Sequence, residues 1–241
     1  MKQAAERVEK APFITFEGGE GAGKSTQIKR LAARLQGAGV DVVMTREPGG
    51  SPKAEQIRAL LLAGAAKRFG TLAEAVLFSA ARIDHIDTLI APALRRGTWV
   101  LCDRFVDSTR VYQGASGGID PRQIAALERV VAGDVMPDLT VILDLPAEAG
   151  LARAAARTGT AGASDRFEAE GLGFHEKLRE AFLSIAAAEP GRCVVIDATK
   201  DKDDVEEAIW TAVVERLPIP AAARAKMQPS KRTKRGPRVP S

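Results

Sequence analysis

The residues best suited to chemistry begin with a glycine-rich segment near the N-terminus. Its sequence, GGEGAGKS over residues 18–25, matches the pattern G-x-x-x-x-G-K-S/T at every fixed position. Such glycines let the backbone turn tightly and point its N–H groups at phosphate oxygens. We expect Lys24 to reach the β- and γ-phosphates and the hydroxyl of Ser25 to bind Mg2+. The predicted ATP-binding residues are Gly18, Gly19, Glu20, Gly21, Ala22, Gly23, Lys24, Ser25 and Thr26.

A chance glycine-rich turn is the alternative, and the flanking sequence argues against it. Residues 13–16 form a short apolar run typical of a buried strand, and residues 26–36 have the apolar spacing of a helix. Strand, glycine-rich loop and helix follow one another in the order that a phosphate-binding loop requires. The motif predicts nucleotide binding but leaves the reaction open.

Four further segments predict an acceptor site, because in an open α/β sheet ligands bind outside the carboxyl ends of the strands. TREPGG (45–50) and LCDR (101–104) stand at strand ends, and the polar loop DSTRVYQG (107–114) follows the second of them. FSAAR (78–82) lies on a long predicted helix, where Phe78 and Arg82 share one face.

These segments contain side chains that suit a nucleotide acceptor. A ring and a guanidinium side by side, as in Phe78 and Arg82, fit a planar base with carbonyl oxygens, although core packing alone also explains Phe78. Asp103 can hold Mg2+ through water and Arg104 can bind phosphate, the alternative being a surface ion pair. Hydrogen bonds to a base are available from Thr109 and Gln113.

Strands and helices alternate along the chain, which predicts an α/β fold: one parallel five-stranded sheet with helices on both faces, in three layers, as in P-loop kinases. The predicted strands are 13–16, 40–44, 99–102, 139–145 and 193–196. The predicted helices are 26–36, 54–62, 72–94, 121–132, 147–156, 167–188 and 203–216, with a small, flexible stretch at 159–164.

Taken together, the segments FEGGEGAGKST, TREPGG, LFSAAR, CDRFVDSTRVYQG and PDLTVILDL closely resemble those of the bacterial thymidylate kinases. The resemblance covers roughly residues 13–216, and TREPGG and the DR-to-YQG segment are far more specific than the phosphate loop. It implies transfer of a phosphoryl group from ATP to dTMP, giving dTDP, with Mg2+ and in a homodimer.

The resemblance also implies roles for individual residues. Phe78 is expected to stack on thymine, Arg82 to bond a base carbonyl, Thr109 and Gln113 to lie at the base edge, and Tyr112 to crowd the sugar C2′ and favour deoxyribose.

Around the sugar and phosphate, the resemblance places Glu20 near the sugar 3′-hydroxyl. It makes Arg58 and Arg104 ligands of the dTMP phosphate, and it puts Glu47 and Asp103 around the metal and the acceptor.

A lid is expected at about residues 153–168, where RAAARTGTAGASDR places arginines around a small-residue stretch. Members of the resembled family carry a catalytic arginine either in the phosphate loop or in the lid. The phosphate loop has none here, so Arg153, Arg157 and Arg166 join Lys24 and Arg104 as catalytic candidates. A solvated helix end is the alternative, and which lid arginine dominates stays open.

Charge is unevenly distributed along the 241 residues. The net charge is +4, but residues 221–241 hold seven basic side chains and no acid, so the remainder stands at −3. We expect an extension over 1–11, a kinase domain over 12–218 and a disordered basic tail over 219–241. That tail is either a solubilising extension or a site for nucleic acid, for which nothing else in the sequence argues.

Other features of the sequence narrow the function. The two cysteines, Cys102 and Cys193, lie in or beside apolar runs and are expected to be buried and reduced. With no signal-peptide stretch and no long apolar run, we expect a cytoplasmic protein without a membrane partner. The main alternative is another nucleoside or nucleoside-monophosphate kinase, which shares the phosphate loop and the DR segment. A GTPase is disfavoured, because Thr199-Lys200-Asp201-Lys202 has lysine where a guanine-binding element needs aspartate.

Overall fold

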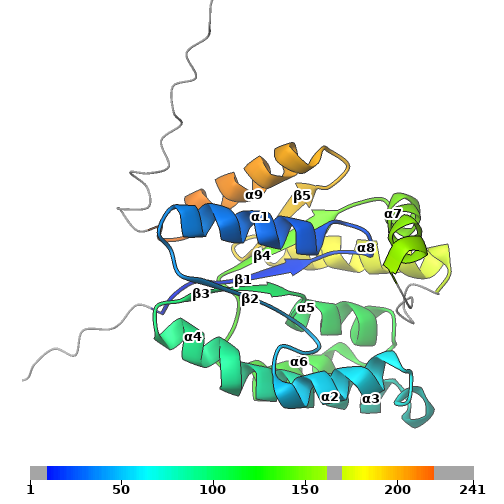
Figure 1. Ribbon diagram of the computed structural model, residues 1–241. Coiled ribbons are helices and arrows are strands. Elements are labelled where there is room, and N and C mark those ends of the chain that lie inside the picture. Colours follow the sequence, from blue (N-terminus) through cyan, green and yellow to red (C-terminus); the bar gives the residue numbers. More distant parts are fainter. Residues whose placement is uncertain (1–9, 162–169, 220–241) are drawn as a thin grey trace, which may run out of the picture.

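A parallel five-stranded sheet forms the centre of the computed structural model, which describes residues 10–161 and 170–219 and, for 157–161, the backbone alone (Figure 1). The strand order is β2-β3-β1-β4-β5, and every pairing is parallel, which confirms the predicted α/β class. The strands are β1 Phe13–Glu17, β2 Val42–Arg46, β3 Trp99–Asp103, β4 Leu139–Asp144 and β5 Cys193–Asp197.

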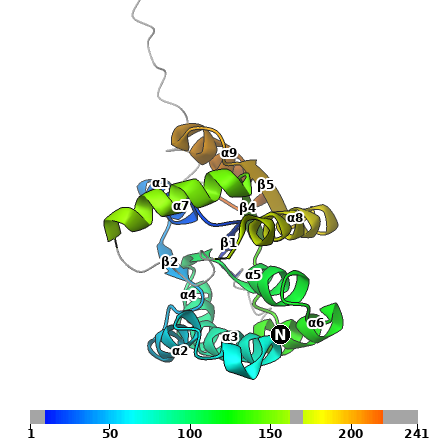
Figure 2. The ribbon, with the colours of Figure 1, turned by 90° about the vertical axis from the view of Figure 1, so that its right-hand side faces the viewer.

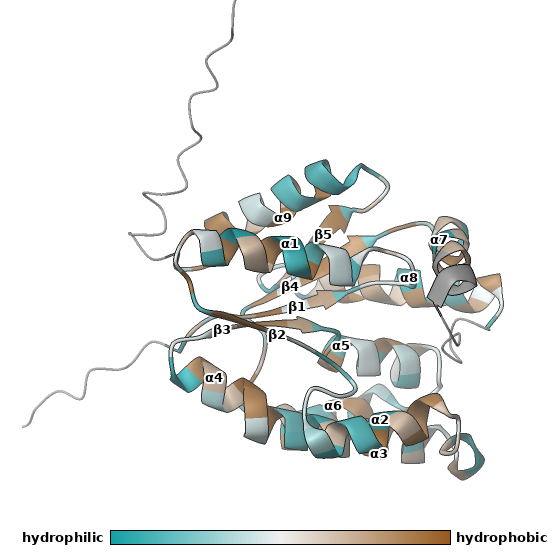
Figure 3. Ribbon diagram, in the orientation of Figure 1, coloured by the Kyte–Doolittle hydropathy of each residue, from teal (hydrophilic) through white to brown (hydrophobic). Residues whose placement is uncertain are grey.

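Helices cover both faces of this sheet (Figures 1 and 2). One face carries α1 (Lys24–Gly37) and α9 (Lys202–Arg216), and the other carries α8 (Leu172–Ala188) and α4 (Ala91–Arg95). The three inner strands are almost wholly buried and hydrophobic (Figure 3), as expected where a parallel sheet is covered on both sides.

A further group of helices lies beyond α4 and forms the lower half of the molecule in Figure 1. Three of them pack together there, namely α2 (Pro52–Leu62), α3 (Thr71–His85) and α6 (Pro121–Ala132). The remaining elements are the 3-10 turn η1 (Lys67–Phe69), the π-helical turns η2 (Ile86–Ile90) and η3 (Arg110–Ala115), and the helices α5 (Val106–Thr109) and α7 (Ala147–Ala161).

The predicted loop at 107–114 is wrong, because the chain is helical there through α5 and η3. The carboxylate of Glu17 explains the start of this helix, since it accepts hydrogen bonds from the N–H groups of Phe105 and Ser108. Free N–H groups at the beginning of a helix need such an acceptor. Here the acceptor comes from another strand, which local sequence patterns do not reveal.

Several predicted boundaries also change. The helix predicted over 72–94 is interrupted at Ile86 by the π-helical turn η2, which buries both Ile86 and Ile90. The helix predicted from residue 167 begins at Leu172, after the extended Gly171. Backbone helix continues in α7 to Ala161, into the stretch predicted to be flexible. Strand β2 begins two residues late because Val40 still bonds back to Leu35.

Strand register brings the predicted chemical segments to one edge. Asp103, at the end of β3, is the register partner of Phe16 in β1 and of Arg46 in β2. The phosphate loop, TREPGG and the DR segment therefore leave the sheet side by side. Both cysteines are buried and free, as predicted, and none of the helices in the described ranges is long and apolar enough to cross a membrane.

Candidate active site

A cleft of about 1740 Å3 opens at this carboxyl edge, larger than the few hundred to 1,000 Å3 typical of a site for one small ligand. It is lined by seven predicted residues of the phosphate loop, Glu20 to Thr26, but not by Gly18 or Gly19. The other predicted residues that line it are Glu47, Arg58, Phe78, Arg82, Asp103, Arg104, Thr109, Tyr112, Gln113 and Arg153. Of the remaining lid candidates, the side chain of Arg157 and the whole of Arg166 lie outside the described residues.

The phosphate loop is shaped by close backbone contacts. Gly21 has φ +66°, and a Cβ there would collide with the carbonyl oxygen of Gly150 at the start of α7. Lys24 curls over the loop, and its Nζ donates to the carbonyl oxygens of Gly18 (3.1 Å) and Gly19 (2.8 Å). Burial lowers the pKa of Lys24 from its usual value. A phosphate in the loop gives this ammonium a stronger acceptor than two carbonyls.

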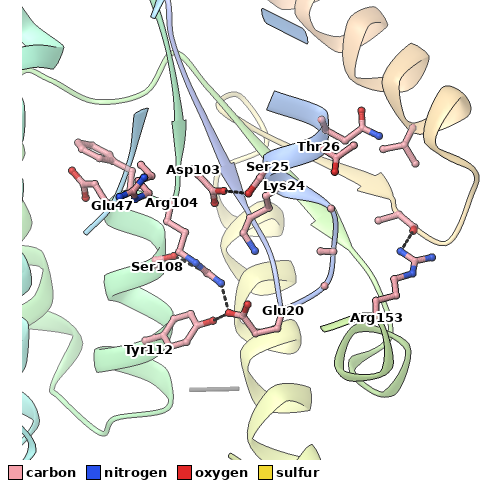
Figure 4. Close-up of a pocket in the computed structure, with 18 of the residues that line it drawn as sticks. Glu20, Lys24, Ser25, Thr26, Glu47, Asp103, Arg104, Ser108, Tyr112 and Arg153 are labelled. Carbon is pink, nitrogen blue, oxygen red and sulfur yellow. Dashed lines mark hydrogen bonds and ion pairs between the residues drawn. The ribbon is translucent and has the colours of Figure 1, made fainter. Parts of the chain in front are cut away.

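Oxygen ligands suited to Mg2+ lie beside the loop. Ser25 Oγ donates to Oδ2 of Asp103 at 2.7 Å (Figure 4). Ser25 lies in the first turn of α1, and Asp103 lies at the end of β3. Among residues 10–161 and 170–219 no cluster of three or more His, Cys, Asp and Glu side chains could hold a metal by itself. One carboxylate and one hydroxyl fit an ion that draws its other ligands from water and substrate phosphates, as Mg2+ commonly does.

Arg104 lies between the phosphate loop and α5. Its guanidinium donates to Glu20 (2.6 Å), to the carbonyl oxygen of Gly18 (3.3 Å) and to Ser108 (3.2 Å). The backbone of Arg104 has φ +68°, the only positive φ of a non-glycine residue in the described part of the chain. This conformation costs on the order of 1 kcal/mol. It is held by the bond from its N–H to the carbonyl of Phe16 (2.9 Å).

Glu20 neutralises this arginine in the free protein. Burial by itself would raise the pKa of Glu20, but Arg104, Lys24 and the hydroxyl of Tyr112 outweigh it and lower the pKa to about 2. Glu20 is therefore a carboxylate at every physiological pH. A dianionic phosphate that reaches Arg104 must compete with it.

Glu17 supports the site from behind through the lining residue Ser108 and was not among the predicted residues. It is fully buried at the end of β1 and accepts from Phe105 N (2.7 Å), Ser108 N (3.3 Å) and Ser108 Oγ (2.6 Å). Burial, together with the charge of Asp107, raises its pKa to about 7. The signal in the sequence is an acid that closes an otherwise apolar strand directly before the first glycine of the loop.

The wall formed by α3, α5 and η3 carries the residues predicted to bind the acceptor. Phe78 is partly exposed toward the cleft, whereas Arg82, Thr109 and Gln113 are each less than a tenth exposed. Arg82 donates from Nη2 to the hydroxyl of Thr109 (3.0 Å), so the structure joins two of the predicted base-binding residues directly.

Glu47 and Arg58 come from the second strand end and from α2. Arg58 donates to the carbonyl oxygen of Pro48 at 2.7 Å and lines the cleft. The carboxylate of Glu47 is bound at both oxygens, by Arg82 Nε (2.7 Å) and by His85 Nδ1 (3.0 Å). In this geometry Glu47 supports Arg82, and its oxygens are already occupied by protein partners.

The opposite end of the cleft lies between α7 and α9. Arg153 donates from Nη1 to the carbonyl oxygen of Ala198 at 3.1 Å, on the far side of the phosphate loop from Tyr112 (Figure 4). The segment from Lys200 to Asp203, which enters the first turn of α9, lines the same end and was not among the predicted site residues. The lining residues thus lie on both sides of Lys24, and we refer to these two ends of the one cleft as its compartments (Figure 4).

Comparisons with known proteins agree with this geometry. The family model described as thymidylate kinase matches residues 16–209. A thymidylate kinase from Bradyrhizobium diazoefficiens is 60% identical over 211 residues, which cover 87% of this chain and 92% of that protein. One from Nitrobacter winogradskyi is 58% identical over 228 residues, covering 93% of this chain and 99% of that protein.

A solved structure supports the fold as well. The crystal structure of thymidylate kinase from Ehrlichia chaffeensis superposes with a TM-score of 0.69 at 34% sequence identity. The match covers 85% of this chain and 99% of that one.

The raised pKa of Glu17 predicts how stability changes with pH. Because the folded pKa lies above the ordinary value of 4.5, the stabilising effect of the proton is complete below about pH 4.5 and is lost as the pH rises through 7. Between pH 5 and 7.5 the wild type should therefore lose about 1–3 kcal/mol of unfolding free energy relative to Glu17→Gln. Urea denaturation at a series of pH values measures this difference. If the unfolding free energies of the wild type and Glu17→Gln change with pH in the same way, the raised pKa of Glu17 is contradicted.

Proposed function

The chain belongs to the thymidylate kinase family, and from this premise we propose how its cleft works. The protein phosphorylates dTMP to dTDP with ATP as the donor. The observation that carries the site assignment is the two-compartment cleft, with one phosphate loop where the compartments meet. We propose that residues 12–218 form the catalytic domain, with 153–168 as its lid.

ATP occupies the compartment between α7 and α9 in this proposal. Its phosphates lie on the backbone of residues 18–26, with Lys24 on the β- and γ-phosphates. Its base lies against Arg153 and the segment from Ala198 to Lys202, which are joined by a hydrogen bond and line that end of the cleft. The position of Arg153 supports a role in holding the donor nucleotide. A second role, in neutralising charge on the transferred phosphate, requires its guanidinium to reach the phosphates.

Mg2+ is proposed to bind at Ser25 and, through water, at Asp103. The contact between these two side chains and the hard-oxygen chemistry of the set support this. When bound, the ion neutralises charge on the phosphates. Ser25 and Asp103 hold one side of it in register with the loop.

The acceptor base and sugar occupy the wall of α3, α5 and η3. We place the thymine ring on Phe78, with Arg82 at a base carbonyl and Thr109 and Gln113 along the base edge. Hydrogen bonds within the described residues use Nε and Nη2 of Arg82, which leaves Nη1 for the base. Tyr112 is bonded to Glu20 (3.3 Å) and closes the space beside the sugar, in keeping with a preference for deoxyribose.

The acceptor phosphate is proposed to bind Arg104 and Arg58. Arg104 is already charged and aimed at an anion, because it holds the carboxylate of Glu20 in the free protein. Displacement by phosphate frees Glu20 to accept a hydrogen bond from the sugar 3′-hydroxyl.

Phosphoryl transfer itself demands alignment and charge neutralisation more than proton transfer, since the attacking group is already a phosphate anion. The cationic groups assigned to this are Lys24, Arg104 and the lid arginines Arg153, Arg157 and Arg166. Exclusion of water by the lid would protect ATP from hydrolysis.

A homodimer and a cytoplasmic location are also proposed. The face for the dimer is the outer side of α2, η1 and α3. Its large hydrophobic residues are between 42% and 64% exposed: Leu60, Phe69, Leu72, Val76 and Ile83. Within α3, the spacing of the last three puts them on one side of the helix. Exposed apolar patches of this kind mark protein interfaces. The basic tail, of which residues 220–241 lie outside the described residues, is proposed only as a solubilising extension.

Replacing Lys24 tests the phosphate-loop assignment. Lys24→Ala should lower kcat about 100- to 1000-fold, because a preorganised cation at the transferred phosphate is lost. A coupled assay with ATP, Mg2+ and dTMP measures the change. Lys29→Ala, an exposed lysine on the same helix, should retain wild-type turnover. Near-normal turnover in Lys24→Ala would refute the assignment of the phosphate-binding loop.

Removal of the metal tests the Ser25–Asp103 site. Activity should vanish in EDTA and return with added Mg2+. Asp103→Asn should raise the Mg2+ concentration needed for half-maximal activity about 10- to 100-fold. Asp87→Asn, an exposed aspartate on η2, should leave the Mg2+ titration unchanged. Identical titrations for Asp103→Asn and the wild type would rule out the site.

A charge placed on the apolar face tests the dimer. Val76→Asp should convert the wild-type dimer into a monomer in light scattering coupled to gel filtration, because an unpaired carboxylate would be buried at the interface. Val130→Asp on α6, where the valine is 77% exposed, serves as the matched control and should remain dimeric. A monomeric wild type, or a dimeric Val76→Asp, would refute the proposed interface.

A further inference from the structure

A chain of four polar side chains runs from the end of β2 to the arginine on the acceptor wall. Thr45 Oγ1 lies 2.7 Å from Nε2 of His85, and Nδ1 of His85 lies 3.0 Å from Oε1 of Glu47. Oε2 of Glu47 accepts from Nε of Arg82 at 2.7 Å. We call these four side chains the Arg82 support.

Because these side chains are buried, their polar atoms need hydrogen-bond partners within the protein. His85 is fully buried, and the side chains of Glu47 and Arg82 are each 4% exposed. A buried ion pair needs its remaining oxygens and protons satisfied, or it loses more in desolvation than it gains. The second oxygen of Glu47 is satisfied only by His85 among the hydrogen bonds of the described residues.

The surroundings fix the roles of the two ring nitrogens. A carboxylate can only accept, so Nδ1 of His85 donates to Glu47. In the neutral ring Nε2 then accepts from the hydroxyl of Thr45, which lies 2.7 Å away. Each link therefore constrains the next. The result is a guanidinium at the wall of the cleft whose Nε and Nη2 are fixed, while the hydrogen bonds of the described residues do not use Nη1.

The loop 45–50 is built around this histidine. Gly50 has φ +86°, and a Cβ there would collide with Nε2 of His85 and with Oγ1 of Thr45. The second glycine of TREPGG thus leaves room for the ring. A larger residue would push His85 away from Glu47.

We propose that His85 is a positioning residue for acceptor recognition: by fixing Glu47 it aims Arg82 at the acceptor and sets the preference for a pyrimidine with a carbonyl at C4. This rests on the proposed role of Arg82 at the base. An amino group in place of that carbonyl would face N–H donors of Arg82 and would be rejected.

Two substitutions of His85 test the proposal. Each replaces the ring by an amide that imitates only one of its two nitrogens. His85→Asn places an amide nitrogen near Nδ1 and keeps the bond to Glu47. His85→Gln places it near Nε2 and keeps only the bond to Thr45. Steady-state constants for dTMP and dCMP, with ATP saturating, are compared for both and for the wild type.

For His85→Gln we expect KM for dTMP to rise about tenfold while kcat and KM for ATP stay within about threefold. The ratio of kcat/KM for dTMP to that for dCMP should fall about tenfold, since loss of one aligned hydrogen bond is worth roughly that factor. His85→Asn should stay within about threefold of the wild type in both quantities.

Ser51→Ala is the matched control. Ser51 ties the same loop to α3 through Asp84 (2.6 Å), and its hydroxyl forms no hydrogen bond with the Arg82 support in the part of the chain that the structure describes. It should leave the dTMP-to-dCMP ratio unchanged. Thermal melting of every variant reports any general loss of structure.

The outcomes separate this inference from the proposed function. If His85→Gln and His85→Asn behave alike, or if Ser51→Ala shifts the ratio as much as His85→Gln, the role of His85 is overturned. Arg82→Gln tests the premise, because it should abolish the preference for dTMP. An unchanged ratio in Arg82→Gln would instead refute Arg82 as the base-recognising residue.

Discussion

The parallel pairing of β1 with β3 is the constraint on which the site depends. It sets the end of β1, from which the phosphate loop departs, beside Asp103 and Arg104 at the end of β3. Ser25 and Asp103 are within hydrogen-bond distance only because these two strands are adjacent and in this register. A slip of one residue would turn Asp103 to the other face of the sheet. The chemistry of the cleft is thus fixed by backbone hydrogen bonds in the core.

Charge in the free protein is arranged so that each cation already has a weaker partner than phosphate. Lys24 donates to two carbonyl oxygens of its own loop, and Arg104 to the carboxylate of Glu20. These contacts hold the side chains near the positions where phosphates bind, so little rotamer entropy remains to be lost when a ligand arrives. The neighbouring cations Arg104 and Lys24 lower the pKa of Glu20 to about 2, as expected where positive charge gathers around a carboxylate.

Local sequence was sufficient for the features that depend on local geometry. The strand, glycines and helix of the phosphate loop follow from spacing. The start of α6 at Pro121 was likewise predicted, and Asp120 caps it by accepting from the N–H of Arg122. The sheet and the set of cleft residues were also predictable, in large part through the family resemblance. The helical form of 107–114 was not, because its first N–H groups bond to Glu17, about ninety residues earlier in the chain.

The Arg82 support shows why such long-range features escape pattern analysis. Thr45, Glu47, Arg82 and His85 come from two segments whose contact is made only when α3 packs beneath the end of β2. In the sequence, His85 is one of several polar residues on the predicted helix 72–94, for which a satisfied core histidine is an equally good interpretation. What distinguishes the two is the identity of its partners. Both of its nitrogens are bonded to residues of the loop that also orients the acceptor wall, so its burial serves geometry at the cleft as well as packing.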